Sequence, residues 1–571
     1  MTNSDKSYCR ELVQLLCAYG VTDVILSPGS RNAPLIMAVC RQPGLRHRIV
    51  IDERSAAFVA LGLSAQSQRP VAVICTSGSA MLNLAPAIAE AFYRDIPLIA
   101  VTADRPAEWI DQNDSQTIRQ PGALDNIVRA HFDVPVENGT SQQAWMVNRE
   151  LNDILQTATG VHPGPVHINV QLDTPLSDET EVSDDKKPRV IGVVERPTLL
   201  STAEARALGR RLAPPQKVLI VAGGMAPDQK ISRAVTRLAS ISNVAVLYEE
   251  QANIKGRGAL THIDCMLCSM TEQEKSAMLP DVVITMGGAP VSAHLKKWLR
   301  NADNFTHWHI GQCGHAVDLF RRLELRIELP PASFLPQLAS ALQPYSAQGG
   351  GYAKAWQMLS LRAYGHLQKY AAAAPWSDFS AVRMLTEALP QGTNLQVSNG
   401  TAIRLAQIFT SKKAHRFDCN RGVSGIDGST STAIGAAIAY NGLTVLLTGD
   451  MSAQYDMGAL GCTFIPPTLR IAVLNNGGGG IFRCIKTTSR LPELDECFAA
   501  QVRLPLEQFA RGFGFKYLKA TDEQSMLNAL KTFTEPYHNP IILDIRTDGN
   551  ISAEVFKNFF KSANPNNSKT L

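Results

Sequence analysis

The chain has 571 residues, of which 45% are hydrophobic and 19% are charged. This composition excludes a disordered, collagen-like or coiled-coil protein, and the length suggests three or four domains. The formal net charge of +4 is too small to indicate a nucleic-acid partner. No apolar stretch approaches the length of a membrane span and the N-terminus lacks a secretory signal, so we expect a cytoplasmic protein with no membrane partner.

The first 175 residues alternate short apolar runs with helical stretches. The runs predict strands at 24–26, 49–51, 71–75, 97–101 and 166–170. Because these runs do not alternate between apolar and polar residues, they favour a parallel sheet that is covered by helices on both faces. In such sheets the functional loops follow the carboxyl ends of the strands.

Two breaks divide the rest of the chain. Residues 176–197 are polar and charged, as in a linker, and residues 343–352 (QPYSAQGGGY) are rich in Gly and Gln. Apolar runs predict strands at 218–221 and 282–285 between the breaks, and at 445–447, 471–474 and 541–545 after them. We therefore predict an α/β protein of three domains with parallel sheets, at 1–180, 195–345 and 355–571.

Two motifs in the last third of the chain follow predicted strands. The first is Gly449-Asp450-Met451-Ser452, and the second is Asn475-Asn476 followed by four glycines at 477–480. A carboxylate and a carboxamide offer the oxygen ligands that Mg²⁺ and Ca²⁺ prefer, and glycines allow the backbone to approach a ligand closely. Each motif alone could be an ordinary turn. At this spacing the pair favours a metal-bridged phosphate or diphosphate site.

Other polar residues stand at predicted loop positions in both halves of the chain. Glu53 lies between an apolar run and a helix, where it could face a ligand, cap the helix or pair with Arg54, and the spacing alone favours the cap. Four loop arginines could converge on carboxylates or form unrelated surface salt bridges: Arg31, Arg105, Arg404 and Arg421.

Two groups of possible metal ligands are weaker. Cys265 and Cys268, with His262 nearby, lack the second Cys pair of a zinc ribbon. His307 and His309 alternate on an apparent strand before Cys313 and His315. For these histidines we expect a partly exposed edge strand in preference to a metal site.

The motifs of the last third, with Glu53, resemble those of thiamine-diphosphate enzymes. In that superfamily a Gly-Asp and an Asn-Asn bind the diphosphate through a divalent cation, and the domains follow in the order pyrimidine, central and diphosphate. Three segments narrow the resemblance: residues 27–35 (SPGSRNAPL), 102–106 (TADRP) and 420–428 (NRGVSGIDG). They closely resemble the 2-succinyl-5-enolpyruvyl-6-hydroxy-3-cyclohexene-1-carboxylate synthases of menaquinone biosynthesis.

The resemblance implies thiamine diphosphate and Mg²⁺, with Mn²⁺ as an alternative, in a homodimer or tetramer with active sites between subunits. It gives Glu53 the catalytic contact to the aminopyrimidine ring and makes Asp450, the Asn476 side chain and the Gly478 carbonyl the metal ligands. The implied cofactor contacts are Asn399, Ile426, Gly449, Met451, Ser452, Ile481 and Phe482, together with Glu53, Asp450 and Asn476.

The implied reaction is decarboxylation of 2-oxoglutarate and 1,4-addition of the resulting succinyl carbanion equivalent to isochorismate. By resemblance, Arg404 and Arg421 hold the succinyl carboxylate. The residues implied for isochorismate are Ser30, Arg31, Arg105 and Gln116. Two rival functions are another thiamine-diphosphate decarboxylase or carboligase, and a non-catalytic nucleotide-binding α/β protein.

The chain departs from the family pattern at two positions. Ala293 stands where the family usually has a lysine, which Lys296 or Lys297 could replace only if the local helix shifts. Gly400 stands where a serine is common, so one hydroxyl donor to the diphosphate is missing unless Thr401 or a backbone N–H replaces it. Neither departure touches Glu53 or the metal ligands.

Overall fold

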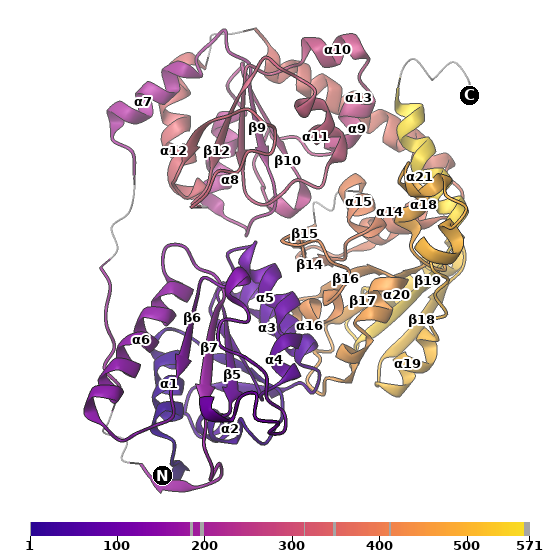
Figure 1. The fold of residues 1–571 in the computed structure, drawn as a ribbon. Coiled ribbons are helices and arrows are strands. Elements are labelled where there is room, and N and C mark those ends of the chain that lie inside the picture. The colour runs from indigo at the N-terminus through magenta and orange to yellow at the C-terminus, as the bar shows by residue number, and fades with distance from the viewer. Residues whose placement is uncertain are drawn as a thin grey trace.

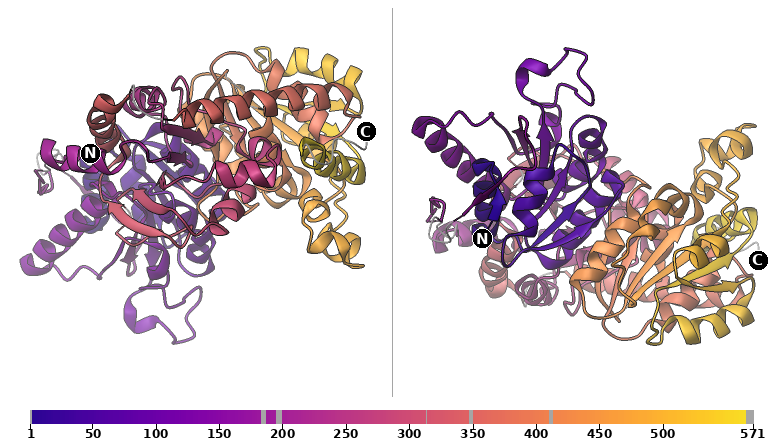
Figure 2. Two further views of the ribbon diagram at one scale, coloured as in Figure 1. Left: turned by 90° about the horizontal axis from the view of Figure 1, so that it is seen from above. Right: turned by 90° about the horizontal axis from the view of Figure 1, so that it is seen from below.

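The computed structural model describes residues 2–182, 187–194, 199–312, 314–346, 350–409 and 413–564. Its main body consists of three parallel sheets, each flanked by helices (Figure 1). These sheets confirm the predicted fold class. The two views of Figure 2 show the central domain on one side of the molecule, and the hydrogen bonds between Asn253 and the Phe417 backbone join it to the third domain. Parts of the predicted linker and Cys313 lie outside the described residues.

The first sheet has the strand order β3-β2-β4-β5-β7-β6. Its strands are β2 (Asp23–Leu26), β3 (Arg46–Ile49), β4 (Val71–Cys75), β5 (Leu98–Asp104), β6 (Ala130–Val134) and β7 (Val166–Gln171). Its helices are α1 (Ser7–Ala18), α2 (Ala33–Cys40), α3 (Glu53–Ser67), α4 (Ser79–Asn83), α5 (Ala85–Phe92) and α6 (Ser141–Thr159). A short antiparallel pair, β1 (Thr2–Ser4) with β8 (Glu179–Glu181), lies outside this sheet.

The strand predicted at 49–51 is wrong in position, since β3 ends at Ile49. Arg46 and Arg48 pair with Asp23 of the neighbouring strand, at 2.6 and 2.7 Å. These ion pairs make the polar residues 46–48 part of an edge strand, where charged side chains are common. The apolar run therefore marks the end of the strand and not its middle.

The third sheet has the order β15-β14-β16-β17-β19-β18, which repeats the topology of the first sheet. Its strands are β14 (Thr393–Val397), β15 (Ala414–Cys419), β16 (Thr444–Gly449), β17 (Leu469–Asn475), β18 (Lys516–Ala520) and β19 (Ile541–Arg546). The main helices are α13 (Tyr352–Ala373), α14 (Asp378–Ala388), α15 (Thr401–Ile408), α16 (Ser429–Ala439), α17 (Asp450–Tyr455), α18 (Gly480–Cys484), α19 (Leu506–Gly512), α20 (Glu523–Phe533) and α21 (Gly549–Ala563).

The central sheet has the order β10-β9-β11-β12-β13. Its strands are β9 (Val218–Ala222), β10 (Val244–Tyr248), β11 (Val282–Met286), β12 (Thr306–Ile310) and β13 (Leu323–Ile327). Its helices are α7 (Thr202–Arg211), α8 (Gln229–Leu238), α9 (Ile263–Cys268), α10 (Glu272–Ala277), α11 (Ala293–Arg300) and α12 (Pro331–Leu342). The expected edge strand at His307 and His309 is wrong, because β13 pairs with the outer side of β12 and both histidines are buried.

Helices α3 and α16 cross between the first and third sheets, where they join the two domains (Figure 1). Their backbones touch because both carry a glycine at the crossing. A Cβ atom on Gly62 would lie 2.0 Å from the Thr432 carbonyl oxygen, and one on Gly435 would lie 2.1 Å from the Val59 oxygen. Glycine is thus required on both sides for this close approach. Within the described residues, no helix is both long and apolar enough to cross a membrane.

Candidate active site

Asp450 and Asn476 lie together at the carboxyl ends of two neighbouring strands. Strand β16 ends at Gly449, directly before Asp450, and β17 ends directly before Asn476. The Asp450 Oδ2 atom accepts hydrogen bonds from the backbone N–H groups of Gly477 and Gly478, both at 2.9 Å. Burial raises the pKa of Asp450 to about 6. The two predicted motifs therefore form one buried polar site.

The orientation of the Asn476 amide is fixed by Asp378, an acid that sequence reasoning missed. Asn476 Nδ2 donates to Asp378 Oδ2 at 2.7 Å, and Thr547 Oγ1 donates to Asp378 Oδ1 at 2.6 Å. Asp378 is buried, and burial raises the pKa of its carboxyl group. Because the amide nitrogen is held by Asp378, the Asn476 Oδ1 oxygen remains for a cation.

The oxygen atoms at this site fit a hard divalent cation. Asp450 supplies a carboxylate, Asn476 an amide oxygen and Gly478 a backbone carbonyl, which are donor types that Mg²⁺ accepts. Gly478 has φ +146°, and a Cβ atom there would lie 2.2 Å from the Ala499 oxygen, so only glycine fits. Among the described residues, no cluster of three or more His, Cys, Asp or Glu side chains could hold a metal ion elsewhere.

The side chains predicted to contact a cofactor surround these two strand ends. Ser452 Oγ donates to the Ile426 carbonyl at 2.6 Å, which ties the loop 420–428 to α17. A Cβ atom on Gly479 would lie 3.1 Å from the Met451 sulfur and 2.6 Å from the Phe482 ring. Ile426, Met451 and Phe482 thus belong to the neighbourhood of Asp450, and Ile481 precedes Phe482 on α18.

Asn399 holds the loop 420–428 from the end of β14. Its Nδ2 atom donates to the carbonyls of Asn420 and Gly425, at 2.6 and 2.7 Å, and its Oδ1 atom accepts from Arg421 Nη1 at 2.9 Å. The predicted contact of Asn399 with the cofactor stays a prediction. Gly400 has φ +98°, a conformation that strains a serine, which accounts for glycine at this position.

Three cations gather where the central domain meets the third domain. Burial lowers the pKa values of Arg404 and Lys296, and the nearby charge of Arg421 lowers them further. Lys296 reaches back along α11 to donate to the Pro290 carbonyl at 3.0 Å. The charge of Lys296 therefore interacts with both arginines without any shift of α11.

Arg404 lines a small cavity together with the acids Glu249 and Asp264 and with Ser292, so this cavity by itself does not favour an anion. The feature that suits an anion belongs to Arg421. Among the described residues, the Arg421 Nε atom is buried without a hydrogen-bond partner. A buried donor of this kind is expensive unless a ligand satisfies it.

Glu53 is the first residue of α3, but it does not cap the helix. Asp52 is the cap, since its Oδ1 atom accepts from the backbone N–H groups of Arg54 and Ser55, at 2.9 and 3.2 Å. Arg54 instead donates to the Tyr455 carbonyl at 2.9 Å. The favoured interpretation of Glu53 as a cap is therefore wrong. Among the described residues, no hydrogen bond or ion pair occupies the Glu53 carboxyl group.

The residues predicted to bind isochorismate meet at the carboxyl edge of the first sheet. Arg31 donates to the Leu172 carbonyl at 2.8 Å, and Arg105 donates to the Ser115 carbonyl at 3.0 Å. Burial lowers the pKa of Arg31, and the neighbouring charge of Arg105 adds to this. Gln116 follows Ser115, and Ser30 is exposed beside Arg31. Among the described residues, no hydrogen bond links this group to Asp450 or Arg404.

Sequence reasoning also missed Glu90, which binds the loop 420–428 from the first domain. Its Oε1 and Oε2 atoms accept from the N–H groups of Gly422 and Val423, both at 2.8 Å. A usable signal exists for Glu90, because it is the one charged residue in the apolar helix α5. No comparable signal exists for Asp378, since acids are common in the first turn of helices.

Known proteins resemble this chain over nearly its whole length. Residues 8–123 match the family described as thiamine pyrophosphate enzyme, N-terminal TPP binding domain. The chain is 37% identical to the 2-succinyl-5-enolpyruvyl-6-hydroxy-3-cyclohexene-1-carboxylate synthase of Porphyromonas gingivalis, covering 98% of this chain and 97% of the relative. It is 35% identical to the proteins of the same name from Bacteroides thetaiotaomicron and Cytophaga hutchinsonii, over 98% and 97% of this chain and 99% and 98% of the relatives.

The similarity thus extends over nearly the whole chain. The chain belongs to the family of 2-succinyl-5-enolpyruvyl-6-hydroxy-3-cyclohexene-1-carboxylate synthases, which are thiamine-diphosphate-dependent transferases.

Proposed function

We propose that the protein decarboxylates 2-oxoglutarate and adds the succinyl unit to isochorismate in menaquinone biosynthesis, with thiamine diphosphate and Mg²⁺. The observation that carries this proposal is the pairing of Asp450 with an Asn476 amide whose oxygen is left for a cation. Asp450, Asn476 Oδ1 and the Gly478 carbonyl hold the metal, and Mn²⁺ suits the same oxygen atoms. Thiamine diphosphate, when bound, supplies the electron sink for decarboxylation.

The side chains around the metal hold the cofactor by contact and hydrogen bonding. Ser452 and the backbone of Gly449 would hold the diphosphate end, and Asn399 keeps the adjacent loop in place. The apolar side chains of Ile426, Met451, Ile481 and Phe482 would contact the rings of the bound cofactor and shield it from water.

Glu53 acts from a second copy of the chain. Its carboxyl group has no partner among the described residues, and it lies beside Ile51, which is 81% exposed, and Ile49, which is 46% exposed. Apolar side chains at such exposure indicate a covered surface in the assembled protein. We therefore propose a homodimer, alone or within a tetramer, in which Glu53 of one copy would share a proton with the aminopyrimidine ring of a cofactor whose diphosphate end would be held at Asp450 of the other copy.

The cationic groups select the substrates. Arg404 and Arg421 bind the distal carboxylate of 2-oxoglutarate, because guanidinium groups recognise carboxylates through two hydrogen bonds. Arg31, Arg105, Gln116 and Ser30 bind isochorismate. Lys296, whose charge interacts with those of Arg421 and Arg404, takes the role of the lysine that the family has at position 293. The domain division at 1–180, 195–345 and 355–571 and a cytoplasmic location complete the proposal.

The shared site is tested by mixing two inactive variants, Glu53→Gln and Asp450→Asn, with subunit exchange. If each site takes Glu53 from one copy and Asp450 from the other, a mixed dimer retains one intact site, and an equal mixture recovers about a quarter of the wild-type activity. If both residues of one chain served one site, the mixture would stay inactive. Glu53→Gln alone is expected to abolish turnover and to keep most of the thermal stabilisation by the cofactor.

The donor and the class of protein are tested separately. Release of CO₂ from 2-oxoglutarate but not from pyruvate supports the proposal over another thiamine-diphosphate decarboxylase. A thermal shift with thiamine diphosphate and Mg²⁺ that nucleotides do not reproduce excludes a nucleotide-binding protein without activity. Product formation that requires isochorismate completes the assignment.

A further inference from the structure

The loop 420–428 carries Arg421 and is held by a carboxylate from another domain. Glu90, on α5 of the first domain, accepts one backbone N–H from Gly422 and one from Val423, each at 2.8 Å and each on a different carboxylate oxygen. Glu90 is fully buried, and burial raises the pKa of its carboxyl group. A Cβ atom on Gly422 would lie 2.7 Å from the Glu90 carbonyl oxygen and 3.0 Å from Oε2. The loop and α5 are therefore in direct contact.

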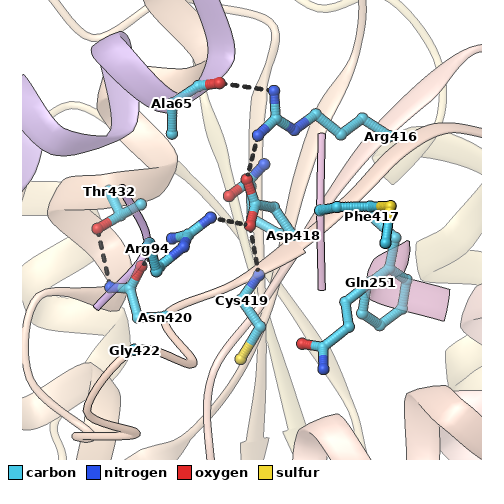
Figure 3. A network of polar contacts seen from close by, with 12 residues as sticks. Ala65, Arg94, Gln251, Arg416, Phe417, Asp418, Cys419, Asn420, Gly422 and Thr432 are labelled. Carbon is cyan, nitrogen blue, oxygen red and sulfur yellow. Dashed lines mark hydrogen bonds and ion pairs between the residues drawn. The ribbon is translucent and has the colours of Figure 1, made fainter. Parts of the chain in front are cut away.

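A buried ion network of Arg94, Arg416 and Asp418 joins the same two domains (Figure 3). Arg94 donates to Asp418 Oδ1 at 2.5 Å, and Arg416 donates to Asp418 Oδ2 at 2.7 Å and to the Ala65 carbonyl at 2.6 Å. Arg94 also lies 3.6 Å from Glu90. Although burial opposes ionisation, these two arginines hold the pKa of Asp418 below its usual value. The network fixes α5 relative to β15, which leads into the loop.

Arg421 stands between two anchors of the loop. Asn399 binds the Arg421 side chain and the carbonyls of Asn420 and Gly425. Glu90 binds the two residues that follow Arg421. With Asn399 on one side and Glu90 on the other, the backbone of residues 420–425 has little freedom, and the guanidinium group is held in one place before a substrate arrives.

We propose that Glu90 is a positioning residue for Arg421: it holds the backbone that aims the guanidinium group at the carboxylate of the donor. The identity of the carboxylate that Arg421 binds rests on the proposed function. The anchoring of the loop by Glu90 does not. Two converging N–H donors need two acceptor atoms, which a carboxylate offers and a carboxamide does not. A preorganised arginine lowers the cost of binding an anion, so its effect falls on substrate affinity and not on cofactor affinity.

The test compares Glu90→Gln with Asp228→Asn. Asp228 accepts the N–H groups of Lys230 and Ile231 on one oxygen, Oδ1, which an amide keeps, so this variant controls for the loss of a carboxylate without the loss of an acceptor atom. Hydrogen exchange is expected to accelerate at residues 420–425 in Glu90→Gln only. The KM for the donor substrate is expected to rise about tenfold at nearly constant kcat and cofactor affinity. Glu90→Asp, which keeps both acceptor atoms, is expected to recover part of this loss.

A double-mutant cycle separates positioning from a general structural role. In an Arg421→Met background, Glu90→Gln is expected to change the donor KM by less than about twofold, because Glu90 acts through Arg421. Unchanged exchange in the loop, or an equal rise of KM with and without Arg421, would overturn the proposal. If Glu90→Gln does not fold, Gly422→Ala perturbs the same contact from the loop. Faster loop exchange in a protein that fails to decarboxylate 2-oxoglutarate would support the anchor and refute the proposed donor.

Discussion

Replacing Gly62 by alanine should force α3 and α16 apart. The new Cβ atom would lie 2.0 Å from the Thr432 carbonyl oxygen, whereas ordinary van der Waals contact begins at 3.4 Å. The atom it meets belongs to the backbone, so no change of rotamer can relieve the clash. Residues 55–65 of α3 are all buried, and separation of the helices therefore weakens packing along the whole contact.

The expected change in the free energy of unfolding combines losses from overpacking and lost contacts with a gain in helix propensity. Overfilling a packed core costs about 1–3 kcal/mol, and a gap of roughly 0.5–1 Å forfeits about a quarter to a half of each dispersion contact. Alanine recovers about 1 kcal/mol of helix propensity relative to glycine. If the dispersion loss about cancels the propensity gain, the net loss in the free energy of unfolding is about 1–3 kcal/mol, which lowers the melting temperature by roughly 2–12 °C for a domain of about 150–250 residues.

Gly365→Ala is the matched control for this prediction. Gly365 lies on the exposed side of α13, and a Cβ atom there meets nothing within 4 Å. This variant should keep or raise the melting temperature, because only the propensity gain remains. Thermal and urea denaturation measure both variants. A Gly62→Ala protein as stable as Gly365→Ala would refute the close contact between α3 and α16.

Three further substitutions test the site and its surroundings. Lys296→Met should raise the KM for one of the two substrates about tenfold without loss of thermal stability, and steady-state kinetics with both KM values unchanged would contradict its role. Asp378→Asn should weaken apparent Mg²⁺ affinity about tenfold by freeing the Asn476 amide, as measured by Mg²⁺ titration of the cofactor-dependent thermal shift; an unchanged titration would contradict the role. Burial raises the pKa of Asp456 from 3.8 to about 6, so the folded protein binds more protons than the unfolded chain between these pH values and loses stability as the pH rises through them. Asp456→Asn should remove up to about 3 kcal/mol of this dependence of stability on pH. The hydrogen bond from Ser431 N–H can remain, because an amide oxygen also accepts. Equal pH profiles of denaturation for both proteins would show that the carboxyl group does not titrate in this range.

The sheets and the Asp450–Asn476 pair could be predicted from the sequence because they depend on local signals. Buried parallel strands read as continuous apolar runs, and their carboxyl ends share one edge of the sheet. The prediction failed where burial comes from a distant segment. Strand β12 is interior only because the amphipathic β13 (LELRI) pairs with it, and no feature of residues 306–310 reveals that neighbour.

The polar contacts that orient the site residues could not be predicted from the local sequence either. Asp378 and Asn476 are far apart in the chain, and so are Glu90 and Gly422. Sequence spacing relates residues on one helix or strand, whereas these pairs depend on how separate elements pack. The prediction that Glu53 caps the helix failed for a smaller reason, because Asp52 precedes it by one position and the exact start of the helix decides which acid is the cap.

The strand order that the first and third sheets share also shows which helices meet at the α3–α16 crossing. Helix α3 connects the second and third strands of the first domain, and α16 connects the second and third strands of the third domain, so the crossing joins equivalent elements. Glu53 begins α3, and the loop 420–428 ends where α16 begins. A Cβ atom on Gly428 would lie 2.2 Å from the Phe58 ring, which places α3 against the end of this loop. The α3–α16 contact thus holds both Glu53 and the loop 420–428 of one chain. Since that acid is proposed to serve the other copy, a change at the crossing should disturb both sites of a dimer.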